Sequence, residues 1–249
     1  KDIKEQKLRA NTFEIQYKNI LYKHILPFFG DFKIRSIRRS DIERYFLTKK
    51  HMSVSTLKTH RGVIKDVFTY AFDNSYIRVN PAKNFKIEVG HEEKVKEVLN
   101  KEQMDMLINY CLDNPSYLTV GIYLMASYGL SRSEALGIMR SDIDTVNKTI
   151  HIQRSVVKAD GEVIVVNTKN KYRNRVIAVS DETIKLIVED EQYLEKDFIV
   201  SPFGSAWSPA QFTWYFDELV RKLRESGWDI PKVTPHGLRH SRASLWSEA

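Results

Sequence analysis

The segment TPHGLRHSRA, which begins at Thr234, gathers two imidazoles and a guanidinium within five residues. Thr234 followed by Pro235 predicts a helix start, because a hydroxyl can cap the first N–H groups and proline fits the first helical position. His236, Arg239 and His240 are then spaced i, i+3 and i+4, so they share one face of that helix. Cationic side chains beside a helix N-terminus favour an anion site.

Two other interpretations of this helix stay open. His236 and His240 have the spacing of a zinc-binding helix, but Gly237 takes the place of the glutamate in HExxH and no third ligand is indicated. An ordinary helix end with hydrogen-bonded, partly buried histidines would show the same pattern. We expect neither a metal nor a cofactor.

Three more places combine charged residues in a pattern that permits chemistry. YGLSRSEALGI predicts a tight turn that enters a helix with Arg132 and Glu134 near its start. TKNKYRNRVIAV predicts a basic hairpin that carries Lys169 and Lys171 and runs into an apolar strand. The last is a basic helix face that we interpret as DNA-binding, comprising Lys58, His60, Arg61 and Lys65. Each of these, taken alone, would be an ordinary solvated surface feature.

The elements that must position these residues begin with an all-helical domain over residues 1–87. Apolar residues at helical spacing indicate a helix within residues 11–29. The segment 40–43, Ser-Asp-Ile-Glu, predicts a capping box for a second helix. A third helix is expected to begin near Ser53 or Ser55.

A polar run over residues 88–98 is interpreted as a linker, and residues 99–249 predict a second domain of helices and strands. Helices are expected over residues 101–113, 117–128 and 133–139, and from Ser180, Ser208 and Pro235 onward. Strands are expected over residues 149–157, 162–166, 174–179 and 197–201. The predicted fold is therefore mainly α with a small antiparallel β-sheet, in two domains.

Composition restricts the class of protein. The chain has 249 residues, of which 42% are hydrophobic and 29% charged, and its apolar runs fall short of a membrane span. Its single cysteine, Cys111, fits a reducing cytoplasm. The net charge is +7, but it is unevenly placed: residues 1–90 hold 19 Lys and Arg against 9 Asp and Glu, a charge of +10, and the remainder of the chain carries −3. Such an asymmetry predicts that the first domain binds a polyanion.

Taken in order, these motifs resemble the tyrosine recombinases, specifically the integrases of phages and conjugative elements. The resemblance covers nearly all of the chain and rests on ILPFFG, the NPA at residues 80–82, GLSRSEALGI, TKNKYRNRVIA and HGLRH. It implies a helical core-binding domain followed by an α+β catalytic domain. It also implies site-specific recombination of a mobile element through a covalent phosphotyrosine. The implied partners are a double-stranded DNA site, further copies of the chain in a tetramer at the synapse, and a directionality factor.

The resemblance also assigns roles to single residues. Arg239 corresponds to the second catalytic arginine, and His236 to the histidine of the HxxR pair. Lys169 corresponds to the hairpin lysine, with Lys171 as the alternative. Glu134 matches the acidic residue that supports the first arginine.

Two departures from the family pattern bear on function. The first arginine should follow Gly-Leu, where this chain has Ser131, and Arg132 comes one place later, a rotation of roughly 100° on a helix. Either Ser131 leaves the site catalytically crippled, or Arg132 acts through an altered local geometry. The final histidine and the nucleophilic tyrosine have no match up to Ala249, so we expect an incomplete C-terminus. A catalytically inactive DNA-binding protein, a type IB topoisomerase and a metal-dependent nuclease are the alternative functions.

Overall fold

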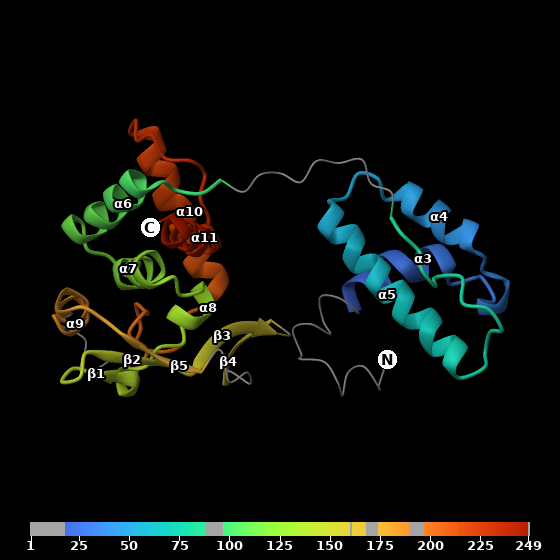
Figure 1. Ribbon diagram of the computed structural model, residues 1–249, viewed down its shortest axis with the longest axis horizontal. Coiled ribbons are helices and arrows are strands. Elements are labelled where there is room, and N and C mark those ends of the chain that lie inside the picture. Colours follow the sequence, from blue (N-terminus) through green and yellow to red (C-terminus); the bar gives the residue numbers. More distant parts are fainter. Residues whose placement is uncertain (1–17, 88–96, 160, 168–173, 190–196, 249) are drawn as a thin grey trace. The chain divides into compact units, whose positions relative to one another are not determined.

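The chain divides into two compact units, Lys1–Val95 and Lys96–Ala249, and each is considered by itself (Figure 1). The computed structural model describes residues 18–87, 97–159, 161–167, 174–189 and 197–248. Most of the predicted linker and both hairpin lysines, Lys169 and Lys171, lie outside these residues. Within the described ranges, no helix is both long and apolar enough to span a bilayer.

The first unit is helical. Its elements are the π-helix η2 (Leu21–Ile25), α3 (Leu26–Phe29), the short 3-10 helix η3 (Ile34–Ser36), α4 (Arg39–Thr48) and α5 (Val54–Asp73). Ser53 caps α5, since its Oγ accepts the Thr56 N–H at 3.2 Å. The predicted capping box for α4 is wrong by two residues. Asp41 accepts the backbone N–H of Arg38 at 2.9 Å and thereby starts the helix earlier, whereas Glu43 pairs with Arg39.

An aromatic cluster lies at the centre of this unit. Tyr45 is fully buried, and Phe28, Phe29 and Phe46 lie around it with ring centroids 5.3 to 5.5 Å from its own. One face of α5 completes the core, with Leu57, Val63, Ile64, Phe68 and Ala71 buried. The apolar spacing of these residues is what makes α5 amphipathic.

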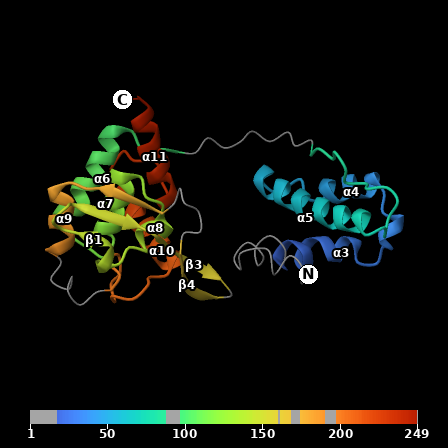
Figure 2. The ribbon, with the colours of Figure 1, turned by 60° about the horizontal axis from the view of Figure 1, so that its bottom comes forward.

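The second unit is built around α7 (Thr119–Tyr128), whose sequence TVGIYLMASY is apolar nearly all round. A helix of this kind is buried on every side, and α7 packs against α6 (Lys101–Asp113), α8 (Arg132–Ala135) and α11 (Pro235–Glu248) (Figures 1 and 2). The other helices within the described part of this unit are η4 (Arg140–Asp142), α9 (Asp181–Val188) and α10 (Pro209–Glu225). In α6 the buried Cys111 has a pKa raised to about 12 by desolvation.

The strands that the structure describes in this unit form two antiparallel sheets, whereas the sequence predicted one. The first is three-stranded, in the order β1 (Ile143–Asp144), β2 (Thr149–Ile152), β5 (Arg175–Ala178). The second is the hairpin of β3 (Arg154–Ala159) and β4 (Glu162–Asn167). The predicted strand over 149–157 divides at Gln153. The strand expected over 197–201 is not formed, because this segment makes only an isolated bridge from Phe198 to Met139.

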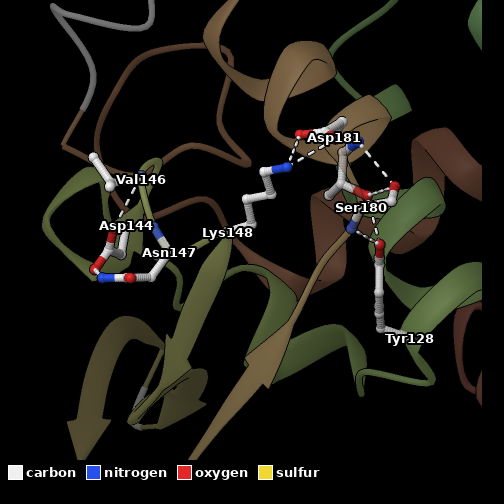
Figure 3. Close-up of polar contacts among 8 residues, drawn as sticks. Tyr128, Asp144, Val146, Asn147, Lys148, Ser180 and Asp181 are labelled. Carbon is white, nitrogen blue, oxygen red and sulfur yellow. Dashed lines mark hydrogen bonds and ion pairs between the residues drawn. The ribbon is translucent and has the colours of Figure 1, made fainter.

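Polar contacts fix the end of β5 to the helices (Figure 3). Ser180, which caps α9, donates its backbone N–H to the Tyr128 hydroxyl at the end of α7, at 3.0 Å. Lys148 precedes β2 and reaches the Asp181 carboxylate at 2.7 Å. The strand that carries Arg175 is therefore tied to α7 and to β2 through the residues that follow it.

Candidate active site

A tight turn connects α7 to α8. Gly129 ends α7 with a φ of 64°, and a Cβ at this position would lie 3.2 Å from the Trp246 ring. Both facts favour glycine. Leu130 is fully buried. Its side chain anchors the turn in the hydrophobic core, and Ser131 follows at the start of α8.

Ser131 acts as the helix cap of α8. Its Oγ accepts the Glu134 N–H at 3.3 Å, while the Ser131 N–H donates to Glu134 Oε2 at 2.9 Å. This reciprocal pair is a capping box. It occupies the serine hydroxyl with a backbone group and aims the Glu134 carboxylate back toward the turn.

The Glu134 carboxylate holds two arginines from distant parts of the sequence. Arg175 Nη1 donates to Oε1 at 3.2 Å, and Arg239 Nη1 donates to Oε2 at 3.1 Å. The carboxylate comes from α8, and the guanidinium groups come from β5 and α11. We call Glu134, Arg175 and Arg239 the Glu134 cluster.

The cluster keeps its carboxylate ionised. Burial alone would raise the pKa of Glu134, but hydrogen bonds from Arg175 and from Ser131 outweigh it and lower the pKa below its ordinary value. With one carboxylate and two guanidinium groups, the cluster carries a formal charge of +1. The Glu134 side chain is 6% exposed, against 31% for Arg175 and 42% for Arg239. The excess positive charge therefore faces solvent.

Helix α11 adds the histidines. Thr234 caps it, because its Oγ1 accepts the Gly237 N–H at 3.1 Å. His236 is exposed in the first turn, and its ring meets that of His240 edge-on with centroids 4.4 Å apart. The ring contact places both histidines on one face of α11, as the i, i+4 spacing predicts.

The position of α11 is set by close packing. A Cβ on Gly237 would lie 2.7 Å from Val233 Cγ2, so the helix approaches the preceding loop closer than any side chain allows. Ser241 is fully buried, donates to the Gly237 carbonyl at 2.9 Å and accepts the Leu99 N–H at 2.8 Å. These contacts fix the backbone from which Arg239 projects.

Arg132 is held elsewhere. Its Nη1 donates to the Thr213 hydroxyl on α10, and burial lowers the pKa of its guanidinium. None of its contacts that the structure describes is with Glu134 or Arg239. The hypothesis that Arg132 replaces the first arginine is therefore not supported, because the one-residue shift turns this side chain toward α10.

Arg175 is a site residue that the sequence did not predict. It was used only to align the hairpin with the family pattern and was given no role of its own. The signal lay in the alternation of NRVIAV. Arg175 and Ile177 are two residues apart in a strand and point to the same side. Val176 is 61% exposed, while Ile177 packs against the core, so Arg175 also faces inward.

Residues 97–249 match the sequence model described as the phage integrase family, and residues 1–51 match its N-terminal SAM-like domain. The chain belongs to the phage integrase family. A curated relative is the tyrosine recombinase XerC-like protein of Caldanaerobacter subterraneus subsp. tengcongensis, which is 27% identical over 173 residues. That alignment covers 66% of this chain and 42% of the relative, so the chain spans less than half of that protein.

Two solved integrases share the fold of this family member. The Tn1549 transposon integrase in complex with a circular intermediate DNA superposes with a TM-score of 0.82 at 20% identity, over 97% of this chain and 82% of that one. A lambda integrase tetramer bound to a Holliday junction gives a TM-score of 0.71 at 17% identity, over 99% and 70% of the two chains. The mainly helical fold with small antiparallel sheets is therefore that of the phage integrases.

The predicted DNA-binding face of this integrase needs one correction. Lys58 and Lys65 are exposed on α5, and Arg61 donates to the Phe85 carbonyl at 3.1 Å. His60 is not on this face. It lies two residues from Lys58, a rotation of roughly 200°, and is 1% exposed in the core, where a hydrogen bond of 2.7 Å joins Nδ1 to the Tyr45 hydroxyl.

A second basic surface of the first unit was not predicted. It is an open hollow of about 880 Å³ whose lining includes five cationic side chains and no carboxylate: Arg35, Arg38, Arg39, Arg78 and Lys83. We call it the basic hollow. Arg35 Nε donates to the Tyr76 carbonyl at 3.0 Å and so joins the two segments that form it. These segments lie about forty residues apart in the sequence, so their charges could not be added together before the fold was known.

Proposed function

We propose that this chain is the DNA-binding and phosphate-binding part of a site-specific recombinase that integrates or excises a mobile element. Strand exchange would proceed through a covalent phosphotyrosine. The observation that carries the proposal is the convergence of Arg239, Arg175 and Glu134, with His236 on the same helix as Arg239, in a member of the phage integrase family. The two solved integrases named above are bound to DNA, which supports the same substrate here.

The chemistry follows from the charge that develops on the scissile phosphate. Strand transfer without an external energy source requires that the energy of the broken phosphodiester bond be conserved in a covalent protein–phosphate bond. Arginine donors suit the nonbridging oxygens of the transition state, because the planar guanidinium stays charged and binds in a fork. His236 is suited to donate a proton to an oxygen or to accept one from the nucleophile. Lys169, or Lys171, is proposed to protonate the leaving 5′ oxygen, and a tyrosine is the proposed nucleophile.

The domains divide the work in this proposal. Residues 1–87 would bind the duplex backbone through the basic hollow and through Lys58 and Lys65, residues 88–98 would pass along the DNA, and residues 99–249 would hold the scissile phosphate. Four copies would assemble at a synapse of two sites, with a directionality factor as a further partner. Many phosphate contacts share the binding energy, so affinity should fall steeply with salt.

The test is formation of a covalent adduct by the protein expressed from its entire gene, on a nicked trap duplex of its own element. We expect an adduct that resists denaturation. Arg239→Ala should reduce its rate at least ~100-fold, as loss of one preorganised donor does. The matched control is Arg221→Ala, which removes an arginine paired with Glu218 and Glu225 on the exposed face of α10. This control should leave the rate unchanged, and equal loss in both variants would contradict the proposal.

A second candidate function is sequence-specific DNA binding without cleavage. Ser131 favours it, because this hydroxyl caps α8 and brings no positive charge to the place where the family has its first arginine. In the same assay this function would give a retained duplex and no adduct.

A further inference from the structure

The Glu134 cluster brings together two arginines where the resemblance supplies a role for only one of them. We propose that Arg175 and Arg239 form a clamp for a single DNA backbone phosphate, with Arg175 providing the guanidinium that Ser131 lacks. This inference rests on the proposed function, since it assumes that the second unit meets DNA.

The first argument is convergence. Arg239 Nη1 and Arg175 Nη2 lie 3.1 and 3.5 Å from the same atom, Glu134 Oε2. The two guanidinium groups repel each other because both are positively charged, and the carboxylate between them holds them together. Such a pair is arranged to meet an anion that is larger than a carboxylate and has oxygens on several sides.

The second argument is exposure. The carboxylate is nearly closed off from solvent, while both arginine side chains remain about a third or more exposed. The partly exposed guanidinium groups therefore keep their positive charge toward solvent, while the buried carboxylate fixes their geometry. Glu134 is in this sense a positioning residue.

The third argument is rigidity. Arg175 lies opposite Ile152 in the β2–β5 ladder, and Ile152 is 1% exposed. Arg239 projects from α11, whose backbone is fixed by Gly237 and Ser241. Donors that are held before the ligand arrives bind it at little cost in ordering. Arg132, by contrast, is engaged by Thr213.

The experiment neutralises one phosphate at a time. Duplexes of the recombination site, each with a single uncharged methylphosphonate, are bound to the unaltered protein and to Arg175→Lys, Arg175→Ala and Arg239→Ala. The unaltered protein should lose about ten- to hundredfold in affinity at one position, as expected for charge-assisted hydrogen bonds. The loss of affinity at that same position should become smaller in Arg175→Ala and in Arg239→Ala, because each variant keeps only one of the two guanidinium groups. Arg175→Lys should retain only part of the effect, because an ammonium cannot bind as a fork.

The control is Arg154→Lys. Arg154 belongs to the neighbouring strand β3, and its guanidinium pairs with the buried Asp142 at 2.8 Å. This variant should keep the complete profile of the unaltered protein. A profile in which Arg175→Ala loses no position, or a different position from Arg239→Ala, would overturn the clamp. If the unaltered protein retains no duplex at all, the proposed function fails; if it retains one and the two profiles differ, only the clamp fails.

Discussion

Each unit of this chain buries an ionisable group, and burial leaves one of the two groups neutral and the other charged. In the first unit His60 lies among Tyr45 and His24, with ring centroids 6.0 and 5.0 Å from its own. Burial lowers its pKa to about 4, with further contributions from His24 and Lys49. In the second unit Glu134 has a counter-charge on either side and stays ionised.

The difference shows what a buried polar group is arranged to do. A buried histidine beside other basic groups gives up its charge and serves as a neutral hydrogen-bonding core residue. A carboxylate between two arginines keeps its charge and imposes a geometry on them. The first arrangement supports a fold, and the second supports a site open to an anion. The predictions below test this contrast.

The largest effect is expected for Glu134→Gln. Removing the charge leaves two guanidinium groups without a counter-ion, and because both are partly exposed to water the cost should be ~3 kcal/mol, the lower end of the range for a buried pair. All four tryptophans lie in the second unit, so urea unfolding followed by tryptophan fluorescence reports its stability. Glu189→Gln is the control, because Glu189 is 63% exposed in a surface pair with Lys185. A loss under 1 kcal/mol for Glu134→Gln would show that the cluster is not held by its charge.

The first unit should lose stability as the pH falls from about 6.5 toward 4. His60 has a lower pKa in the folded chain than in the unfolded chain, so the unfolded state binds the proton first. We expect a loss of ~2 kcal/mol, measured by hydrogen exchange of the α5 amides after correction for the intrinsic rate. His60→Leu should be less stable at neutral pH and should have a smaller slope, of which the remainder belongs to His24, whose pKa is also lowered by burial. An unchanged slope would place the titration elsewhere.

The second unit should respond at lower pH. The pKa of Glu134 is depressed by folding, so its contribution is complete above an ordinary glutamate pKa of about 4.3 and declines as the pH falls below it. Tryptophan fluorescence should therefore stay native across the range in which the α5 amides lose protection. Simultaneous loss of both signals would remove the contrast between the units.

A smaller effect is expected from Gly237→Ala, which tests the close packing of α11 against the preceding loop. The added methyl group overlaps Val233, and overpacking costs about 1–3 kcal/mol. In Gly62→Ala the same change meets nothing within 4 Å on α5 and should stabilise that helix by about 0.5–1 kcal/mol. Thermal denaturation of both variants measures the difference. Equal midpoints would mean that α11 tolerates displacement and does not fix Arg239.

Local signals were readable from the sequence, and long-range ones were not. The helix predicted over residues 101–113 is α6, and its start is set locally by a capping box between Asn100 and Gln103, which are three residues apart. His60 was misplaced although its spacing from Leu57 and Ile64 already put it on the apolar face. The Glu134 cluster joins residues 41 and 105 positions apart, and no local pattern contains that distance. The helices could thus be predicted from the sequence, whereas the contact of Arg175 with Glu134 could not.

The state of Cys111 has a practical consequence. It is the sole thiol of the sequence, it is buried in α6, and it holds its proton far above neutral pH. Alkylating reagents require an accessible thiolate, so we expect that Cys111 does not react with them. A cysteine introduced at Arg78 or Lys65 would then react alone, and a probe attached there would distinguish which basic surface meets the duplex.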